Sequence, residues 1–274
     1  MQLKMYQIDA FTKNIFEGNS AAVVPLDKWL EDDLMQKIAM ENNLSETVFF
    51  VKEGEYYYIR WFTPLAEVDM CGHATLASAY VLFEVLGFGE DTIVFDSKSG
   101  LLHVKKENGK IAMNFPAQEP VRCETLKELQ EAFSAEIQEC YKAMDYILVF
   151  ENEEDIQNTK PILEKMKDID LRGVAITAKS KEYDFVCRFF APKYGIDEDP
   201  VTGSAFTQLV PYWSRVLDQN SFSAKQISKR GGDVFCKFRG DRIEISGYGV
   251  KFFEAIISLN INSKGIRWVK DMTV

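Results

Sequence analysis

The sequence predicts an α+β protein built from two similar units, each a group of strands around one long apolar helix. Three short motifs occur twice in the same order, which indicates an internal duplication. "RWFTP" at residues 60–64 recurs as "RFFAP" at 188–192, an offset of 128 residues. "CGHA" and "SKSG" recur as "TGSA" and "SKRG", both at an offset of 131. Two such units facing one another would leave a cleft between them.

The first unit reads as a helix, a strand, a longer helix and a hairpin. Asp27 can cap the first helix, whose first turn is acidic and whose apolar residues recur at helical spacing. "TVFFV" at 47–51 is typical of a strand. An apolar-periodic segment at 74–86 predicts the longer helix, and Asn108-Gly109 predicts the turn of a hairpin over 101–115.

The second unit repeats this order. A helix is expected at 161–167 and a strand at 173–177. The long helix follows at 204–217, where Pro211 should kink or shorten it. A hairpin over 233–246 closes the unit.

The boundary between the units falls near residues 116–120. We therefore expect a first domain at residues 1–117 and a second at 118–259. Residues 260–274 lie beyond the second copy, and their leftover length suggests that they return to the first domain.

Composition excludes several classes of partner. The 274 residues include 42 acidic and 32 basic ones, a net charge of -10, which repels phosphate backbones and anionic lipids. No apolar run approaches the roughly 20 residues that span a bilayer, and Met1 to Ala10 do not resemble a secretion signal. We expect a cytoplasmic protein that binds neither nucleic acid nor membrane.

Metal and cofactor motifs are not indicated. The five cysteines are scattered without a CxxC pair, which favours free thiols, and the two histidines lack metal-ligand spacing. The sequence has no GxxxxGK[ST] motif, and "SGYGV" at 246–250 lacks the remaining glycine of a dinucleotide fingerprint. We expect no metal and no cofactor.

Gly72 and Gly203 each open a predicted helix. Unpaired N–H groups and the helix dipole favour an anion such as a carboxylate at such a position. Two of these positions related by the duplication could hold one small acid from both sides. Alternatively, the glycines only permit tight turns between strand and helix.

The two glycine motifs also carry reactive side chains. The first has Cys71 and His73, and the second has Asp199, Thr202 and Ser204. A histidine beside a helix N-terminus is held toward its neutral form and can donate or accept a proton. The alternatives are a capping or packing role for His73 and a turn or N-cap role for Asp199.

Glu46 departs from the symmetry of the duplication. It stands in the apolar run 44–50, whereas the matching place in the second unit holds Arg172 and Gly173. A carboxylate at the start of a buried strand is partly desolvated, which suits a general base. Equally, Glu46 could face solvent on the other side of the strand.

Four segments together resemble the PhzF family, the phenazine biosynthesis-like proteins of the diaminopimelate epimerase superfamily. They are "EGNSAAVV" at 17–24, "NLSETVFF" at 43–50, "RWFTPLAEVDMCGHATLA" at 60–77 and "GIDEDPVTGSA" at 195–205. The resemblance implies two domains, each a mainly antiparallel sheet curled around a central helix. It also implies an active site in the cleft, a small carboxylic acid as substrate, and a homodimer.

The resemblance suggests roles for individual side chains. Glu46 resembles the family's acid/base glutamate, which in the phenazine enzyme moves a proton between carbons of dihydro-3-hydroxyanthranilate. His73, Asp199 and Ser204 resemble its partners in substrate binding and proton transfer. The reaction class that follows is a cofactor-independent isomerisation.

The resemblance implies a binding site lined by Asn19 and by the two glycine motifs, with backbone amides near Gly72 and Gly203 holding the carboxylate. Epimerases of the superfamily use two facing thiols. Cys71 falls on the first thiol position, but Thr202 occupies the second, and its hydroxyl is a poor substitute for a thiolate. One-base isomerisation by Glu46 is therefore favoured. An epimerase or racemase using Cys71, and a metabolite-binding protein without catalysis, remain alternatives.

Overall fold

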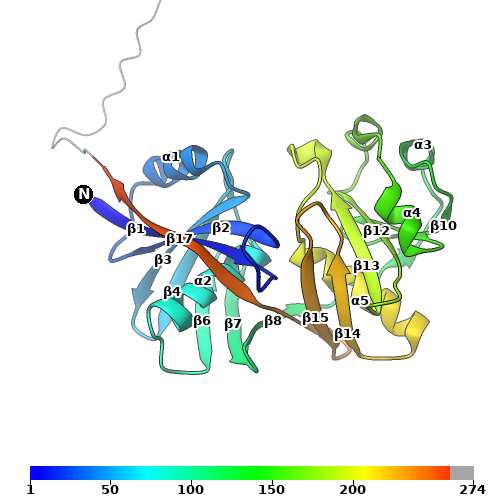
Figure 1. The fold of residues 1–274 in the computed structure, drawn as a ribbon. Coiled ribbons are helices and arrows are strands. Elements are labelled where there is room, and N and C mark those ends of the chain that lie inside the picture. Colours follow the sequence, from blue (N-terminus) through cyan, green and yellow to red (C-terminus); the bar gives the residue numbers. More distant parts are fainter. Residues whose placement is uncertain (260–274) are drawn as a thin grey trace, which may run out of the picture.

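The structure, a computed structural model, describes residues 1–259, and these form two halves joined edge to edge through their sheets (Figure 1). The strands of the first half are β1 (Gln2–Ala10), β2 (Asn19–Leu26), β3 (Glu46–Glu53), β4 (Tyr56–Phe62), β5 (Glu67–Val68), β6 (Thr92–Ser97), β7 (Gly100–Glu107) and β8 (Lys110–Pro116). Its helices are α1 (Asp32–Asn42) and α2 (Gly72–Tyr80), which continues into the π-helical turn η1 (Val81–Val85).

The second half contains most of the remaining elements. Its strands are β9 (Val121–Arg122), β10 (Ile137–Lys142), β11 (Tyr146–Phe150), β12 (Val174–Lys179), β13 (Phe185–Phe190), β14 (Ser221–Gln226), β15 (Gly232–Phe238) and β16 (Arg242–Gly247). Its helices are α3 (Lys127–Ala132), α4 (Glu153–Asn158) and α5 (Gly203–Leu217), with 3-10 turns η2 (Leu163–Met166) and η3 (Pro192–Tyr194). The last strand of the chain is β17 (Gly249–Ser258).

Strand pairing repeats between the halves, as the duplicated motifs predicted. In the first half β2 runs parallel to β3, β3 antiparallel to β4, β4 parallel to β6, and β6 to β8 form an antiparallel meander. The same sequence of orientations runs from β11 through β12, β13 and β14 to β16. The antiparallel pair β8–β16 joins the two sheets. The expected α+β fold of two similar halves is confirmed.

The C-terminal strand belongs to a different sheet from the one expected. β17 leaves the second half and pairs antiparallel with β1 along its whole length (Figure 1). Segment 249–258, which the repeat assigned to the second unit, therefore completes the sheet of the first half. The expectation for residues 260–274 lies outside the described residues.

Each sheet wraps one buried helix. Every residue of α2 from His73 to Ala79 is buried, and α5 is buried from Ala205 to Trp213. A helix that is buried on all sides suits the centre of a curled sheet. Trp213 stacks on Phe185 at 5.4 Å between ring centroids, and its indole N–H donates to Thr177 at 3.0 Å.

α5 continues through Pro211 from Gly203 to Leu217, so the shortening that was one of the two expected effects does not occur. Proline has no N–H for the carbonyl four residues earlier, which is that of Thr207. Gln118, in the segment that links the halves, donates its backbone N–H to that carbonyl at 3.0 Å. The linker thus satisfies the group that the proline leaves free.

Two shorter helices differ from the prediction. α1 begins after Glu31 rather than at a cap formed by Asp27. The helix expected at 161–167 is only the 3-10 turn η2. Arg188 donates to the carbonyl of Ile156 in the last turn of α4 and to that of Thr159, the residue at which α4 ends.

An arginine–glutamate pair holds the chain before each glycine motif. Arg60 binds both carboxylate oxygens of Glu67 at 2.8 and 2.9 Å. Arg188 binds both oxygens of Glu198 at 2.7 and 3.1 Å. Bidentate pairs of this kind are geometrically specific, so they fix the approach to α2 and α5 in the same way.

Among residues 1–259, no helix has the length and apolar character to cross a membrane.

Candidate active site

The central helices of the two halves meet at their N-termini. A Cβ atom built on Gly72 would lie 3.8 Å from the Cα of Gly203, and the reverse distance is also 3.8 Å. Neither glycine has a positive φ, so no special turn conformation requires glycine, and the 3.8 Å distances are ordinary van der Waals contacts. The N-cap residues Cys71 and Thr202 make no side-chain cap to their helices. Two sets of helix N–H groups and two positive dipole ends therefore converge.

His73 lies between a carboxylate and a thiol. Its Nε2 is 2.9 Å from Oε2 of Glu46, and its Nδ1 is 3.4 Å from Sγ of Cys71. Glu46 is the first residue of β3, and its side chain is only 14% exposed. Of the two orientations that the sequence left open, the structure has Glu46 facing inward.

Asn19 connects the two halves at this point. It is fully buried at the start of β2, and its Nδ2 donates to Asp199 Oδ1 at 2.8 Å and to the carbonyl of Val201 at 3.0 Å. The same nitrogen lies 3.3 Å from Nδ1 of His73. Ser45 donates to Oδ1 of Asn19 and fixes the orientation of the amide.

Asp199 and Thr202 are held by a strand of the second half. The hydroxyl of Thr202 donates to Asp199 Oδ2 at 2.5 Å. Gln226, at the end of β14, accepts from the backbone N–H of Thr202 and donates to the carbonyl of Asp199. The proton of the Thr202 hydroxyl is thus engaged by a carboxylate.

Burial and charge change the acidity of these groups. Burial raises the pKa of the Cys71 thiol to about 11, with Glu46 adding to the rise, so the thiol is protonated at neutral pH. Burial raises the pKa of Asp199 to about 6, although His73 and the hydrogen bonds from Thr202 and Asn19 oppose the rise.

His73 differs from the sequence expectation of a neutral imidazole. Burial alone would lower its pKa, but Cys71 and Glu46 raise it well above the ordinary value. Because the thiol is neutral, the Glu46 carboxylate is the partner that keeps a proton on the ring. The influence of the helix N-terminus is outweighed by an acid that arrives from β3.

Glu46, Cys71 and His73 offer ligand atoms within 4.8 Å of one another and could supply three ligands to a metal ion. However, Glu46 and Cys71 face opposite nitrogens of the ring. One ion bound by all three would require the imidazole to turn. The present arrangement suits proton transfer better than ligation.

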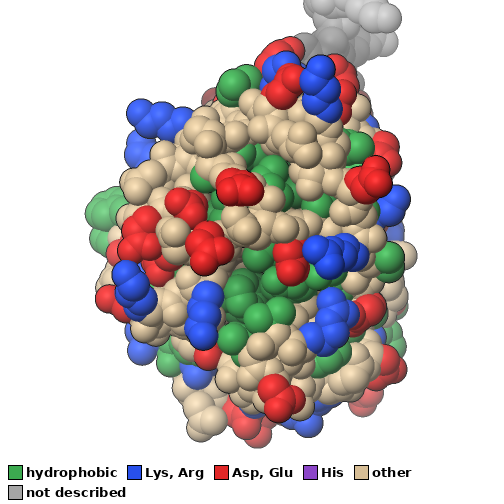
Figure 2. All heavy atoms as spheres, turned by 90° about the vertical axis from the view of Figure 1, so that its right-hand side faces the viewer, with side chains coloured by type: hydrophobic (Ala, Val, Ile, Leu, Met, Phe, Trp, Pro, Cys, Tyr) green, Lys and Arg blue, Asp and Glu red, His purple; other side chains and the backbone are tan. Residues whose placement is uncertain are grey.

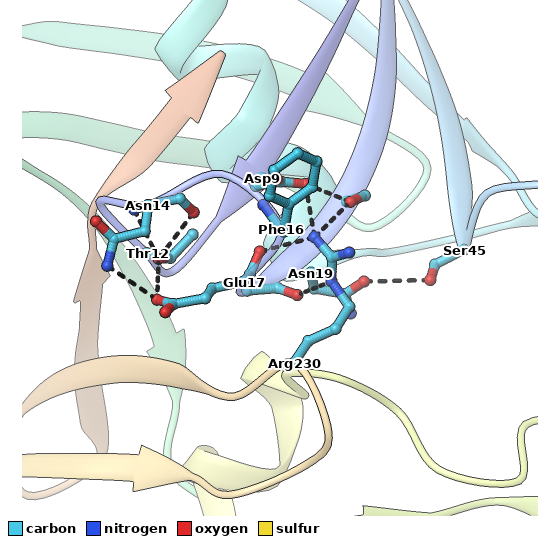
Figure 3. Close-up of polar contacts among 10 residues, drawn as sticks. Asp9, Thr12, Asn14, Phe16, Glu17, Asn19, Ser45 and Arg230 are labelled. Atoms are coloured by element: carbon cyan, nitrogen blue, oxygen red, sulfur yellow. Dashed lines mark hydrogen bonds and ion pairs between the residues drawn. The ribbon is translucent and has the colours of Figure 1, made fainter. Parts of the chain in front are cut away.

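A loop of the first half is clasped by Arg230 of the second (Figure 3). The guanidinium donates to the carbonyls of Gly18 and Glu17 at 2.8 Å each and to the carboxylate of Asp9 at 2.9 Å. Gly18 has φ +65°, and a Cβ there would strike the carbonyl of Ala10. The clasp holds the chain on one side of Asn19.

The structure brings most of the predicted residues into one hydrogen-bonded and ion-paired cluster. Its members are Asn19, Glu46, Cys71, His73, Asp199 and Thr202. Gly72, Gly203 and Ser204 adjoin it at the helix starts, Ser204 being the counterpart of His73 in the duplication. Their catalytic roles stay predictions.

Sequence reasoning did not identify Ser45, Gln226 or Arg230. Ser45 directly precedes Glu46. Arg230 lies inside the repeated motif "SKRG", where the first copy has Ser99, so a search for asymmetries between the copies would have found it.

Four side chains of the site are buried, whereas Glu46, Asp199 and Ser204 keep partial exposure to solvent. Asn19, Cys71, His73 and Thr202 are at most 8% exposed. A separate groove of about 300 Å³ lies on the sheet surface beside Lys110, Ser223 and Phe235.

The chain is similar to known proteins over most of its length. Residues 8–255 match the model of a family described as phenazine biosynthesis-like protein. An uncharacterized isomerase of Pseudomonas aeruginosa is 47% identical over 251 residues, which covers 91% of this chain and 96% of that protein. A PhzF family structure from Enterococcus faecalis has a TM-score of 0.93 and 44% identity, covering 94% of this chain and 100% of that one. A predicted epimerase from Pseudomonas aeruginosa shares the fold, with a TM-score of 0.74 at 18% identity over 93% of this chain and 99% of that one.

Proposed function

Because the chain belongs to the phenazine biosynthesis-like PhzC-PhzF family, we propose that it is an isomerase that moves a proton between two carbons of a small carboxylic acid. Glu46 acts as the acid and base in this proposal. The observation that carries it is the position of the Glu46 carboxylate. It is largely shielded from solvent and contacts His73, beside the point where two uncapped helix N-termini meet.

The converging helix starts provide the anion site. The first N–H groups of α2 and α5 donate to the substrate carboxylate, and both dipoles stabilise negative charge that develops next to it when a proton leaves carbon. A C–H bond beside an unsaturated system is acidic enough for a carboxylate base, so this chemistry requires no cofactor.

Glu46 removes the proton and returns it to a second carbon on the same face. His73 keeps the carboxylate oriented through the 2.9 Å contact and compensates its charge in a buried environment. The hydrogen bond from Asn19 to Asp199 holds the two halves together beside the substrate. Exclusion of water then strengthens each of these interactions.

A two-base epimerase finds less support in the geometry. It would need thiolates or equivalent bases on both faces of one carbon. The pKa of Cys71 is raised to about 11, and the Thr202 hydroxyl is committed to Asp199. We expect a Cys71→Ala variant to retain isomerase activity within a few fold. Complete loss, with ligand protection of the thiol against alkylation, would favour the epimerase.

Deuterium wash-in tests the reaction class and the base together. Wild type is incubated in heavy water with candidate cyclic and amino carboxylic acids, and deuterium at carbon is followed by mass spectrometry. Glu46→Gln should slow exchange by roughly 10²–10⁴-fold, the usual contribution of a general base. Glu53→Gln, at the exposed far end of β3, is the matched control and should exchange like wild type. Equal exchange by Glu46→Gln and wild type would exclude Glu46 as the base.

A further inference from the structure

Two cysteines outside the proposed active site lie side by side. Sγ of Cys123 is 3.4 Å from Sγ of Cys140. Sixteen residues, including α3, separate them in the chain. The other three cysteines, Cys71, Cys187 and Cys236, are buried in the large core that contains α2 and α5.

The backbone holds this pair in a geometry suited to a disulfide. Arg122 and Val121 of β9 stand opposite Tyr141 and Lys142 of β10, so the antiparallel register continues with Cys123 opposite Cys140. Cys123 donates its backbone N–H to the carbonyl of Cys140 at 2.9 Å.

Hydrogen-bonded antiparallel pairs have Cα atoms about 5.5 Å apart, inside the range that disulfides span. Closing the remaining gap requires the sulfurs to approach by about 1.4 Å, which side-chain rotation supplies without moving the strands.

The two thiols differ in access. Cys123 is half-buried, and Cys140 is 2% exposed in the smaller core of the second half. Burial raises the pKa of Cys140 to about 12, and the neighbouring Cys123 thiol adds to the rise. Cys123 is therefore the thiol that meets an external oxidant first, and Cys140 is the thiol that resolves the product.

We propose that Cys123 and Cys140 form a redox-active dithiol that a small-molecule disulfide converts to an intramolecular disulfide, fixing β9 to β10. The Cys123 thiolate attacks one sulfur of the oxidant, forms a mixed disulfide and releases one thiolate. Cys140 loses its proton and attacks the Cys123 sulfur, which releases the second thiolate. Two protein thiols are oxidised and one disulfide is reduced to two thiols, so atoms and electrons balance.

The location gives the modification a structural consequence. β9 is the first strand after the segment that links β8 to the second half. Tyr141, which follows Cys140 in β10, packs against Tyr212 of α5 with 5.1 Å between the ring centroids. Figure 2 shows the side of the molecule that carries β10, where hydrophobic side chains gather between acidic and basic ones. Oxidation would link β9, where the chain enters the second half, covalently to β10, whose Tyr141 contacts α5.

Counting thiols in the folded protein after exposure to glutathione disulfide tests the proposal. The oxidised protein is unfolded in an alkylating agent, and labels are counted by mass. Three labels are expected instead of five, with residues 123–127 and 128–142 joined after trypsin digestion and separated again by dithiothreitol. Five labels, a glutathione adduct that persists on Cys123, or a different cysteine pair would overturn the proposal.

Thermal unfolding supplies a second readout. A closed loop of this length should raise the melting temperature of the oxidised protein by roughly 5 to 10 °C. Cys123→Ala should abolish the rise and leave four labels, whereas Cys236→Ala should keep the rise and leave two. A rise that persists in Cys123→Ala would contradict the assignment. Neither readout depends on the proposed isomerase activity.

Discussion

Replacing Arg230 by glutamine should weaken the contact between the two halves beside Asn19. Arg230 donates to Asp9, Ser20 and two carbonyls of the opposite half, and glutamine reaches at most two of these groups. The variant leaves the Asp9 carboxylate, which is 2% exposed, without its cation. The hydrogen bonds that the arginine makes all surround one turn of the first half (Figure 3).

The size of the effect follows from burial on the two sides of the pair. Breaking a fully buried ion pair costs about 3–5 kcal/mol. The Arg230 side chain is 34% exposed, so water recovers part of the loss, and Asp9 keeps hydrogen bonds from Phe16 and Ser20. We expect the variant to lose about 2–3 kcal/mol of unfolding free energy.

Urea unfolding of the variant beside a matched control measures this value. Arg239→Gln removes an arginine that is 64% exposed and 3.9 Å from its carboxylate partner, and it should change stability by less than about 0.5 kcal/mol. Equal stabilities for Arg230→Gln and Arg239→Gln would show that the buried Asp9 carboxylate does not depend on Arg230.

Three further outcomes follow from the site and the core. In the His103→Gln variant, His73 is the only histidine in the NMR spectrum, and its imidazole should stay protonated above pH 6.5. The stability that the protonated ring contributes should be lost as pH rises through its raised pKa. Titration of the ring near pH 6.5 would contradict the ion pair with Glu46. Isomerase kcat/KM should fall as pH drops through about 6, where Asp199 gains a proton and no longer accepts both hydrogen bonds, and a flat acid limb would argue against its role. Thr177→Val leaves the Trp213 indole N–H buried without an acceptor and should cost about 1–3 kcal/mol in urea unfolding; an unchanged midpoint would count against that bond.

The duplicated motifs predicted the fold well because each motif is local and sits at a structural transition. Gly72 and Gly203 mark helix starts, and Arg60 and Arg188 form the same pair with a glutamate in each half. Glu46 could be singled out because its counterpart position lacks a carboxylate. Short sequence motifs were therefore enough to predict the two helix starts and to single out Glu46.

Long-range contacts decided the features that the sequence did not reveal. β17 pairs with β1 across nearly the whole length of the chain, and no local signal marks that partner. Cys71 and Glu46, the latter from β3, raise the pKa of His73, and Gln118 of the linker donates to the Thr207 carbonyl that Pro211 leaves free in α5. Each depends on a segment that only the fold brings close.

A crystal structure with a carboxylic acid that undergoes deuterium exchange is the decisive test of the anion site between the helices and of Glu46 as the base. The carboxylate oxygens should accept hydrogen bonds from backbone N–H groups at the starts of both α2 and α5. The carbon that exchanges should be the substrate atom nearest to the Glu46 carboxylate. A ligand bound in the sheet groove near Phe235, or one whose exchanging carbon faces Cys71 with Glu46 out of reach, would contradict both assignments.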